Sequence, residues 1–534
     1  MNRFLCAVSS VLLLIAAGCT VDEKMTWSPD GTRAAVETGG GSLRLADTNG
    51  VLSAPIASNV LDAAWLPDGR GLVLLRELTV TNWSEAVRLL PRADVIPVEA
   101  VAGALPAVLK SGLAAVGNDY EAFGDRIVEP LQALKLPLEA ALLCLRDARP
   151  EMWSDLVSTF QSVTNKPGTE EELRDAGSAV VREISVLRLD GVRPAGAPVV
   201  IERTLRKLAE PRPSPGAAAV AYTKDDTLTV APLDGGTGRV EIAERVAGSY
   251  DWTPDGRALV FTVRFTDEWG TTGLNLAHIQ RRAAVDSNGV PVAGASEPLA
   301  MSAFAFPPRV RCLPDGRVLF AGVPMTLPAA EVAGASRLFV ASTSGGTNSG
   351  PVAIPGDPAS LPIDLAAYSV SPDGRRVAIA ESGSDAVAVL DLSTGALEVV
   401  SPSRGAKSRT LPAWRGAGEL FYAALPMKGA ARADWMRWTP GGGAPAAFSA
   451  GWPAAAVEGL LELPGGRASA APAGPAPAAG LPTTTPVTQD RDRKTYDWQT
   501  RHEAVLARHR AVKPDVVILG DSIIHYWEIG RAHV

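Results

Sequence analysis

A short turn motif that recurs through the middle of the chain constrains the fold more than any other feature. An apolar residue ends one strand, Pro-Asp-Gly makes the turn and a short apolar run follows, in five copies whose Pro-Asp-Gly ends at Gly31, Gly69, Gly256, Gly316 and Gly374. Proline fixes φ, aspartate bonds its own backbone and glycine accepts a positive φ, so each copy predicts a tight turn between two strands. Weaker copies occupy 213–216 and 414–416. Short strands repeated in this way predict a radial array of four-stranded blades.

These repeats resemble those of TolB-like and related β-propellers over residues 25–465. The resemblance implies a mainly β fold with six to seven blades, since seven repeat starts favour seven and the weak copies leave six open. We assign the tryptophans, aspartates and glycines of the motif to turns and blade packing. We therefore expect no metal site at Asp30, Asp68, Asp255, Asp315 and Asp373.

A helical insertion is expected between the second and third copies of the motif, over residues 105–182. Apolar residues at a spacing of three and four recur in four stretches: 105–116, 120–134, 137–148 and 170–184. Glu170-Glu171-Glu172 would suit a first helical turn, where acidic side chains are favoured. The insertion would extend from the second blade. It would either hold a partner or cover the propeller rim.

Composition bounds the class of protein. The chain has 534 residues, of which 46% are apolar and 20% charged, so it can bury two or three domain cores. The formal net charge of −7 provides no basic excess for nucleic-acid phosphates, so we expect no nucleic-acid partner. No nucleotide loop or zinc-ligand cluster is evident, and no cofactor or metal is expected. Cys144 and Cys312 are expected to be separate buried thiols, although an exported protein would permit a bridge between them.

Residues 1–19 have the features of an export signal. Arg3 precedes an apolar stretch that is too short to span a bilayer comfortably, and the segment ends in Ala-Ala-Gly-Cys19. This ending resembles a bacterial lipobox, which implies acyl chains on Cys19 and attachment to a membrane without a spanning helix. Thr20 after the cysteine favours the outer membrane. An ordinary cleaved signal peptide is the alternative.

The composition changes after the propeller repeats. Residues 466–490 are rich in alanine, proline and threonine and have no periodicity, so they predict an extended linker. Residues 491–527 then predict an amphipathic helix, a buried strand ending at Leu519, and a sharp break at Gly520-Asp521-Ser522. A strand that breaks in this way before a helix can present the Ser522 hydroxyl as a nucleophile, with backbone N–H groups nearby to stabilise an oxyanion.

The segment from 496 to 527 resembles the start of SGNH (GDSL-type) hydrolases, which are α/β/α esterases. The resemblance implies that Ser522 is the catalytic nucleophile within the motif formed with Gly520 and Asp521. It also implies a late Asp-x-x-His that supplies the base, and this pattern occurs nowhere in the chain. His525 is too close to Ser522 in sequence to replace it. We therefore expect this incomplete domain to be inactive in the present chain.

Residues 528–534 are expected to be foreign to the protein. In one reading frame, a common sequencing adapter encodes Ile-Gly-Arg-Ala-His-Val, which matches residues 529–534.

These features together give a first interpretation of the function. The protein is expected to be an envelope lipoprotein whose propeller binds or scaffolds a partner, joined in the intact gene to an ester hydrolase. Its ligand would be an envelope protein or a glycan. The alternative is a non-enzymatic interaction protein. A propeller-gated peptidase is disfavoured because no Gly-x-Ser-x-Gly occurs.

Overall fold

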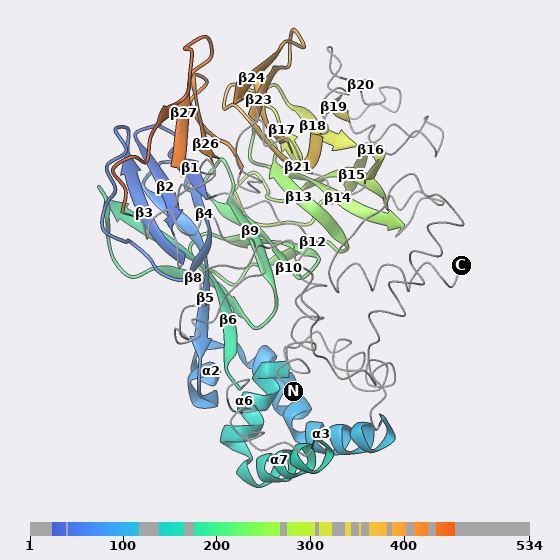
Figure 1. Ribbon diagram of the computed structural model, residues 1–534. Helices are drawn as coiled ribbons and strands as arrows, with labels where there is room; N and C mark the ends of the chain where they lie inside the picture. The colour runs from blue at the N-terminus through green and yellow to red at the C-terminus, as the bar shows by residue number, and fades with distance from the viewer. Residues whose placement is uncertain are drawn as a thin grey trace, which may run out of the picture. The chain divides into compact units, whose positions relative to one another are not determined.

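The strands that the computed structural model describes form seven antiparallel sheets (Figure 1). The structure describes residues 24–38, 41–116, 138–164, 174, 177–266, 275–304, 309–322, 337–342, 352–353, 363–381, 387–401, 411–424 and 434–453. Each sheet is built from strands that follow one another along the chain. This arrangement confirms the mainly β propeller and decides for seven blades over six.

The first three blades take up the N-terminal half of the propeller. Blade 1 contains β1 (Met25–Trp27), β2 (Arg33–Thr38) and β3 (Ser42–Asp47). Blade 2 contains β4 (Val60–Trp65), β5 (Gly71–Val80), β6 (Ala179–Asp190), β7 (Arg193–Pro194) and β8 (Val199–Thr204). Blade 3 contains β9 (Leu208–Pro213), β10 (Ala219–Lys224), β11 (Thr227–Pro232) and β12 (Val240–Ala243).

The remaining four blades each have four strands. Blade 4 contains β13 (Val246–Trp252), β14 (Ala258–Thr266), β15 (Asn275–Ala283) and β16 (Ser296–Phe304). Blade 5 contains β17 (Val310–Cys312), β18 (Arg317–Gly322), β19 (Arg337–Ser342) and β20 (Val352–Ala353). Blade 6 contains β21 (Ile363–Val370), β22 (Arg376–Glu381), β23 (Val387–Asp391) and β24 (Leu397–Ser401). Blade 7 contains β25 (Ala413–Arg415), β26 (Glu419–Ala424), β27 (Asp434–Trp438) and β28 (Ala446–Ala447).

The turn motif links the first and second strands of its blade. The five glycines of the strong copies have φ between +66° and +85°, as the motif predicts. The turns of neighbouring blades also approach closely. A Cβ at Gly374 would lie 2.5 Å from Cδ of Pro314 in the preceding turn, so this position requires glycine for space as well as for conformation.

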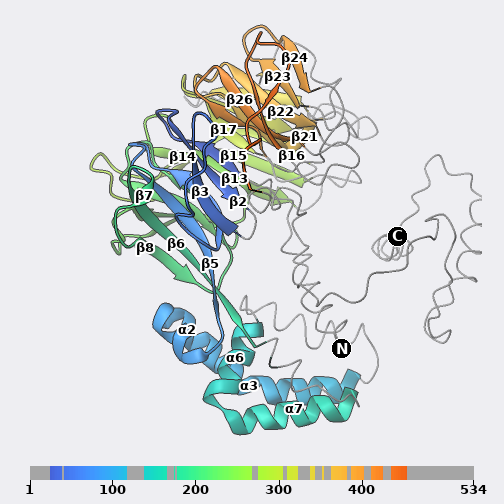
Figure 2. The same ribbon diagram turned by 60° about the vertical axis from the view of Figure 1, so that its left-hand side comes forward.

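The helices lie between β5 and β6, the two longest strands of blade 2 (Figures 1 and 2). They are α2 (Trp83–Leu89), α3 (Arg92–Val116), α6 (Leu138–Ala148) and α7 (Pro150–Thr164). The insertion predicted in blade 2 is therefore present, but its helices begin at Trp83 and not at 105. Asn82 caps α2 by accepting a hydrogen bond from Glu85 N at 2.8 Å, and this cap sets the early start of the helices.

The C-terminal part of the predicted insertion is a strand. Residues 179–182, and the apolar residues up to Ile184, belong to β6, which pairs with β5 from Ala179 to Arg188. Alternate residues of β6 are fully buried at its start, so the local period is two, not three to four. The expected helix at 120–134 lies outside the described residues.

The helical insertion has a hydrophobic core of its own. Trp83, Leu143 and Leu156 are among its buried members, and Val80 and Val181 extend it onto the two strands. Arg146 fixes the junction, because its guanidinium donates to Thr81 O at 2.6 Å and to Gly177 O at 3.2 Å. These carbonyls end β5 and precede β6, so one side chain binds both strands where they enter the insertion.

Tryptophans bind successive blades to one another through a repeated hydrogen bond. The indole N–H of Trp65 donates to Thr26 O of the preceding blade at 2.9 Å. Trp252 and Trp414 do the same at 3.0 Å and 3.2 Å, to Arg212 O and Ser369 O. The motif tryptophans therefore hold the blades together, as expected.

The ring closes between blades 7 and 1 without a shared strand. Here the Trp27 indole N–H has no hydrogen-bond partner, and Arg415 instead stacks over its ring at 5.1 Å. Phe448 and Trp452, which follow blade 7, pack into the same cluster. Trp452 donates to Gly50 O of blade 1 at 2.7 Å. Aromatic packing after the last blade thus closes the ring.

The chain divides into two compact units, Met1–Gly466 and Arg467–Val534. The propeller and its insertion belong to the first unit, and the second lies outside the described residues. No helix in the described part of the chain is long and apolar enough to cross a membrane.

Candidate functional site

The aspartates of the turn motif bond within their own turns. Asp30 Oδ1 accepts from Ser28 Oγ at 2.5 Å and from Thr32 N at 3.0 Å. Donation by Ser28 lowers the pKa of the Asp30 carboxyl. The same bond to the backbone N–H two residues later, at 2.8 to 3.1 Å, recurs at Asp68, Asp255, Asp315 and Asp373. These carboxylates are therefore part of the turns, as their sequence pattern indicates.

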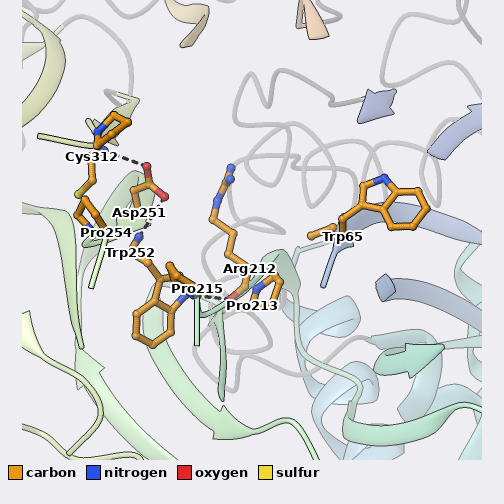
Figure 3. Close-up of a pocket in the computed structure, with 10 residues that line it drawn as sticks. Trp65, Arg212, Pro213, Pro215, Asp251, Trp252, Pro254 and Cys312 are labelled. Atoms are coloured by element: carbon orange, nitrogen blue, oxygen red, sulfur yellow. Dashed lines mark hydrogen bonds between the residues drawn. The ribbon is translucent and has the colours of Figure 1, made fainter. Parts of the chain in front are cut away.

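A cavity of about 410 Å³ opens where the innermost strands of four successive blades end (Figure 3). Its walls combine indoles and prolines with two charged side chains and one thiol. The lining residues are Ala64, Trp65, Arg212, Pro213, Pro215, Asp251, Trp252, Pro254, Cys312 and Pro314. All of them come from the motif turns of blades 2 to 5 or from the strand ends just before them. This axial cavity is the candidate functional site.

Asp251 is held rigidly at the wall of the axial cavity. Its Oδ1 accepts from Trp252 N at 3.0 Å, and its Oδ2 accepts from Cys312 N on the next blade at 2.9 Å (Figure 3). Each oxygen of a carboxylate can accept further hydrogen bonds, so the anchored group can also bind a donor in the cavity. The carboxylate thus links blades 4 and 5 and presents a fixed negative charge.

Arg212 brings a positive charge to the same cavity from β9. Its backbone carbonyl accepts the Trp252 indole N–H, which fixes the main chain, while its guanidinium extends toward the space between Asp251 and Trp65 (Figure 3). Nη2 lies 3.8 Å from Oε2 of Glu210, an ion pair beyond hydrogen-bond distance. A guanidinium offers five donors in a planar fork and suits carboxylate or phosphate groups.

Tyr250 lies beneath these charges and is fully buried. Burial raises the pKa of its hydroxyl well above the ordinary value, Arg212 opposes that shift, and Glu210, Asp62 and Asp251 add to it. The hydroxyl therefore stays protonated and donates to Glu210 O of the preceding blade. Tyr250 supports the strand that carries Asp251 and supplies no acid–base chemistry.

Neither of the two thiols that the structure describes, Cys144 and Cys312, is an activated nucleophile. Burial raises the pKa of Cys312 well above its usual range, and the Asp251 carboxylate adds to this effect. Burial also raises the pKa of Cys144, in the helical insertion, to about 12. Both cysteines are unpaired, which confirms separate thiols, although Cys312 is only partly buried. Reactive cysteines have lowered pKa values, so this cavity offers binding groups and not a sulfur nucleophile.

A second group of charges lies in blade 2 and at its contact with blade 3. Glu183, with no exposed surface, accepts from Arg76 and from Arg203. Burial alone would raise its pKa, but the two guanidinium groups outweigh this and lower it. Glu202 accepts from the Tyr222 hydroxyl at 2.9 Å in the same region. Both carboxylates have internal partners, so Glu183 links strands within blade 2 and Glu202 links blade 2 to blade 3. Among the described residues, no three acidic, histidine or cysteine side chains are grouped as metal ligands.

The site residues predicted from sequence lie elsewhere in the chain. Cys19, Gly520, Asp521 and Ser522 fall outside the described residues, so their roles stay predictions. Arg212 and Asp251 were not predicted from the sequence. A usable signal exists, because each directly precedes the first residue of its turn motif, which is Pro213 in blade 3 and Trp252 in blade 4.

Neither a protein-family model nor a curated protein matches the chain. Among solved structures, TolB from Acinetobacter baumannii is 16% identical with a TM-score of 0.33, over 55% of this chain and 67% of that one. Putative TolB from Agrobacterium tumefaciens is 12% identical with a TM-score of 0.33, over 47% and 83%. The Cps50 (Swd1) propeller domain of Myceliophteria thermophila is 9% identical with a TM-score of 0.41, over 79% and 97%. The seven antiparallel sheets themselves identify this chain as a β-propeller.

Proposed function

We propose that the protein is a binding module of the bacterial cell envelope, anchored through Cys19, whose ligand occupies the axial cavity. The observation that carries this proposal is the cavity itself. Four blades contribute to it, and it combines apolar walls with the fixed charges of Arg212 and Asp251. Ligand sites are typically concave, mostly apolar, and equipped with a few well-placed polar groups.

The chemistry of the cavity favours binding over catalysis. The Cys312 thiol and the Tyr250 hydroxyl have raised pKa values and stay protonated at neutral pH. The two charged side chains, Arg212 and Asp251, carry a guanidinium and a carboxylate, and both groups are suited to ion pairing.

In this proposal the ester hydrolase chemistry belongs to the intact form of the C-terminal segment, with Ser522 as nucleophile. The propeller would then bring that esterase to its target, and an envelope protein or a glycan is the expected ligand.

Site-directed crosslinking in cells tests the binding role. A photoreactive amino acid at Pro215, an exposed residue of the cavity lining, should give discrete adducts after irradiation. The matched control places the same group at Val399, which is 55% exposed on the outer strand β24 of blade 6. Adducts at Pro215 alone support an axial site. Adducts at Val399 alone, or at neither position, contradict it.

The anchor and the esterase each have a separate test. Metabolic labelling with a palmitate analogue should mark the wild type and not the Cys19→Ala variant, and equal labelling would contradict the anchor. Sequencing the source DNA beyond the Trp527 codon should reveal a continued reading frame with an Asp-x-x-His. A genuine stop codon after Val534 would remove the esterase from the proposal and leave the propeller alone.

A further inference from the structure

We propose that Asn49 is a site of spontaneous deamidation that the closed ring protects, so that isoaspartate at this position marks chains in which blades 1 and 7 have separated. The chemistry needs no enzyme. The main-chain nitrogen of Gly50 attacks Cγ of Asn49, ammonia leaves, and water opens the resulting succinimide to aspartate or isoaspartate. Glycine after the asparagine favours the attack, because it has no Cβ to shield the nitrogen. The inference concerns the ring itself and is independent of the axial cavity.

Asn49 lies in the hairpin turn that follows β3 in blade 1, and it is exposed to solvent. Asp47 fixes this turn, since its Oδ1 accepts from Asn49 N and from Val51 N, each at 2.8 Å. Gly50 N donates to Asp47 O at 3.1 Å, and Gly50 has a φ of +82°. Water therefore reaches the asparagine, but the attacking nitrogen is held within the turn and must be released before it can react.

Gly50 is also the residue of blade 1 at which the ring closes. Its carbonyl accepts the Trp452 indole N–H at 2.7 Å, and a Cβ on Gly50 would lie 2.6 Å from Phe448 O. The attack requires rotation about ψ of Asn49, which moves the nitrogen and Cα of Gly50 together. The contacts with Trp452 and Phe448 oppose this movement. Deamidation of Asn49 should therefore depend on local opening between blades 1 and 7.

The hairpin turn of blade 4 provides a matched control within the same chain. Oδ1 of Asp286 accepts from Asn288 N at 2.8 Å and from Val290 N at 2.9 Å. Gly289 N donates to Asp286 O at 3.1 Å, its φ is +80°, and Asn288 is exposed. The surroundings of the glycine differ, because a Cβ on Gly289 would meet only the Ala218 methyl group. No residue in the described part of the chain donates to the Gly289 carbonyl.

Isoaspartate at position 49 would prevent the original closure from forming again. It inserts a methylene into the main chain before Gly50 and places a new carboxylate near Asp47. The added length displaces the Gly50 carbonyl from the Trp452 N–H, and the two like charges repel each other. An opening that is transient in the intact chain thus becomes permanent in the modified one.

Peptide mapping by mass spectrometry tests this inference on the full chain. The protein is incubated at mildly alkaline pH in heavy-oxygen water, which labels each new carboxyl group, and both asparagines are followed in the same sample. Asn288 should be modified at least about fivefold faster than Asn49, a ratio equivalent to about 1 kcal/mol of protection. Trp452→Phe, which removes the N–H and keeps an aromatic ring, should raise the rate at Asn49. Trp452→Ala should bring that rate close to the rate at Asn288.

Asn288 also reports on general unfolding, because it lies in the same molecule and far from the closure. Its rate should be the same in wild type and in Trp452→Phe. Equal rates at the two asparagines in the wild type would overturn the inference, as would a rate at Asn49 that neither Trp452 variant raises. Faster modification of Asn288 in Trp452→Phe would assign the protection to the fold as a whole and would also contradict a role for closure.

Discussion

Ala217 holds a backbone conformation that every strong copy of the turn motif gives to glycine. Its φ is +53°, and it stands at the glycine position of the weak copy in blade 3. A residue with a Cβ is disfavoured in this left-handed region. We therefore expect Ala217→Gly to raise the stability of the propeller by about 1 kcal/mol, measured as a shift of the urea unfolding midpoint.

Gly31→Ala is the matched control for that change. Gly31 has φ +67°, and a Cβ there would lie 3.5 Å from Cγ of Arg415, an ordinary contact. The substitution should lower stability by about 1 kcal/mol through conformation alone. Opposite signs for the two variants are expected. A loss of stability in Ala217→Gly would contradict the assignment of this turn.

Glu183→Gln should destabilise blade 2, whose strands β5, β6 and β8 carry Arg76, Glu183 and Arg203. The glutamate is fully buried between Arg76 and Arg203, and removing its charge leaves both guanidinium groups without their anion. We expect a loss of about 3 kcal/mol, at the low end for a broken buried pair because both arginines are partly exposed. Thermal unfolding at neutral pH measures this difference.

The same substitution has a defined dependence on pH. The folded-state pKa of Glu183 is lowered, so its stabilisation is complete above the ordinary glutamate pKa of about 4.3 and is lost as pH falls through the folded value. The gap in stability between wild type and Glu183→Gln should therefore be constant near neutrality and shrink in acid. A gap that widens on acidification would contradict the lowered pKa.

Single residues were predictable where their role is local. The proline, aspartate and glycine of each turn act within a few residues, so their spacing in sequence sufficed. Arg212 and Asp251 could not be identified in this way, because their role depends on adjacent blades that bring them to one cavity. The unpaired state of Cys144 and Cys312 followed from their separation, whereas the exposure of Cys312 at the axis did not.

At the scale of elements, the helical insertion is expected to depend on Arg146. Arg146→Ala removes the donations to Thr81 O and Gly177 O that fix the two strands at the junction. Amides of α2 and α6 should then exchange faster in hydrogen-exchange mass spectrometry, while those of blades 4 to 6 keep their rates. Arg188→Ala, at a half-exposed surface pair with Asp68, is the control and should change little.

The elements show where periodicity is informative and where it is not. The strand after each turn was predictable because a Pro-Asp-Gly turn directly precedes a short apolar run. The helix at 105–116 was also predictable, since it lies within α3. Residues 179–184 were assigned wrongly because their apolar positions fit both periods, and only pairing with β5 decides for a strand. The early start at Trp83 depends on the Asn82 cap, a single-residue signal.

At the scale of the whole molecule, ring closure should depend on Trp452. Trp452→Ala deletes its bond to Gly50 O and opens a void beside Phe448. We expect a loss of about 3–5 kcal/mol and faster amide exchange in blades 1 and 7, with blades 3 to 5 less affected. Trp452→Phe keeps the apolar packing and should lie between wild type and alanine. Uniform exchange across all blades would contradict a closure that depends on this contact.

The repeats along the chain predicted six or seven blades and their order, but not the manner of closure. Closure depends on contacts between residues that are about as far apart in sequence as the propeller allows, such as Trp452 with Gly50. The axial cavity has the same origin, since it exists only where separate strand ends meet. The ring closure and the axial cavity are therefore properties of the assembled ring, and neither can be predicted from a single repeat.

The central claim, that the charged lining of the axial cavity does the binding, is tested most directly by the yield of the Pro215 crosslink in two arginine variants. Arg212→Gln removes a cation that lines the cavity, and Arg188→Gln removes a surface cation of blade 2 that pairs with Asp68. We predict that Arg212→Gln lowers adduct yield at least about fivefold, equivalent to about 1 kcal/mol of binding, while Arg188→Gln leaves it unchanged. Equal yields in wild type and both variants would show that the ligand binds elsewhere and would contradict the account.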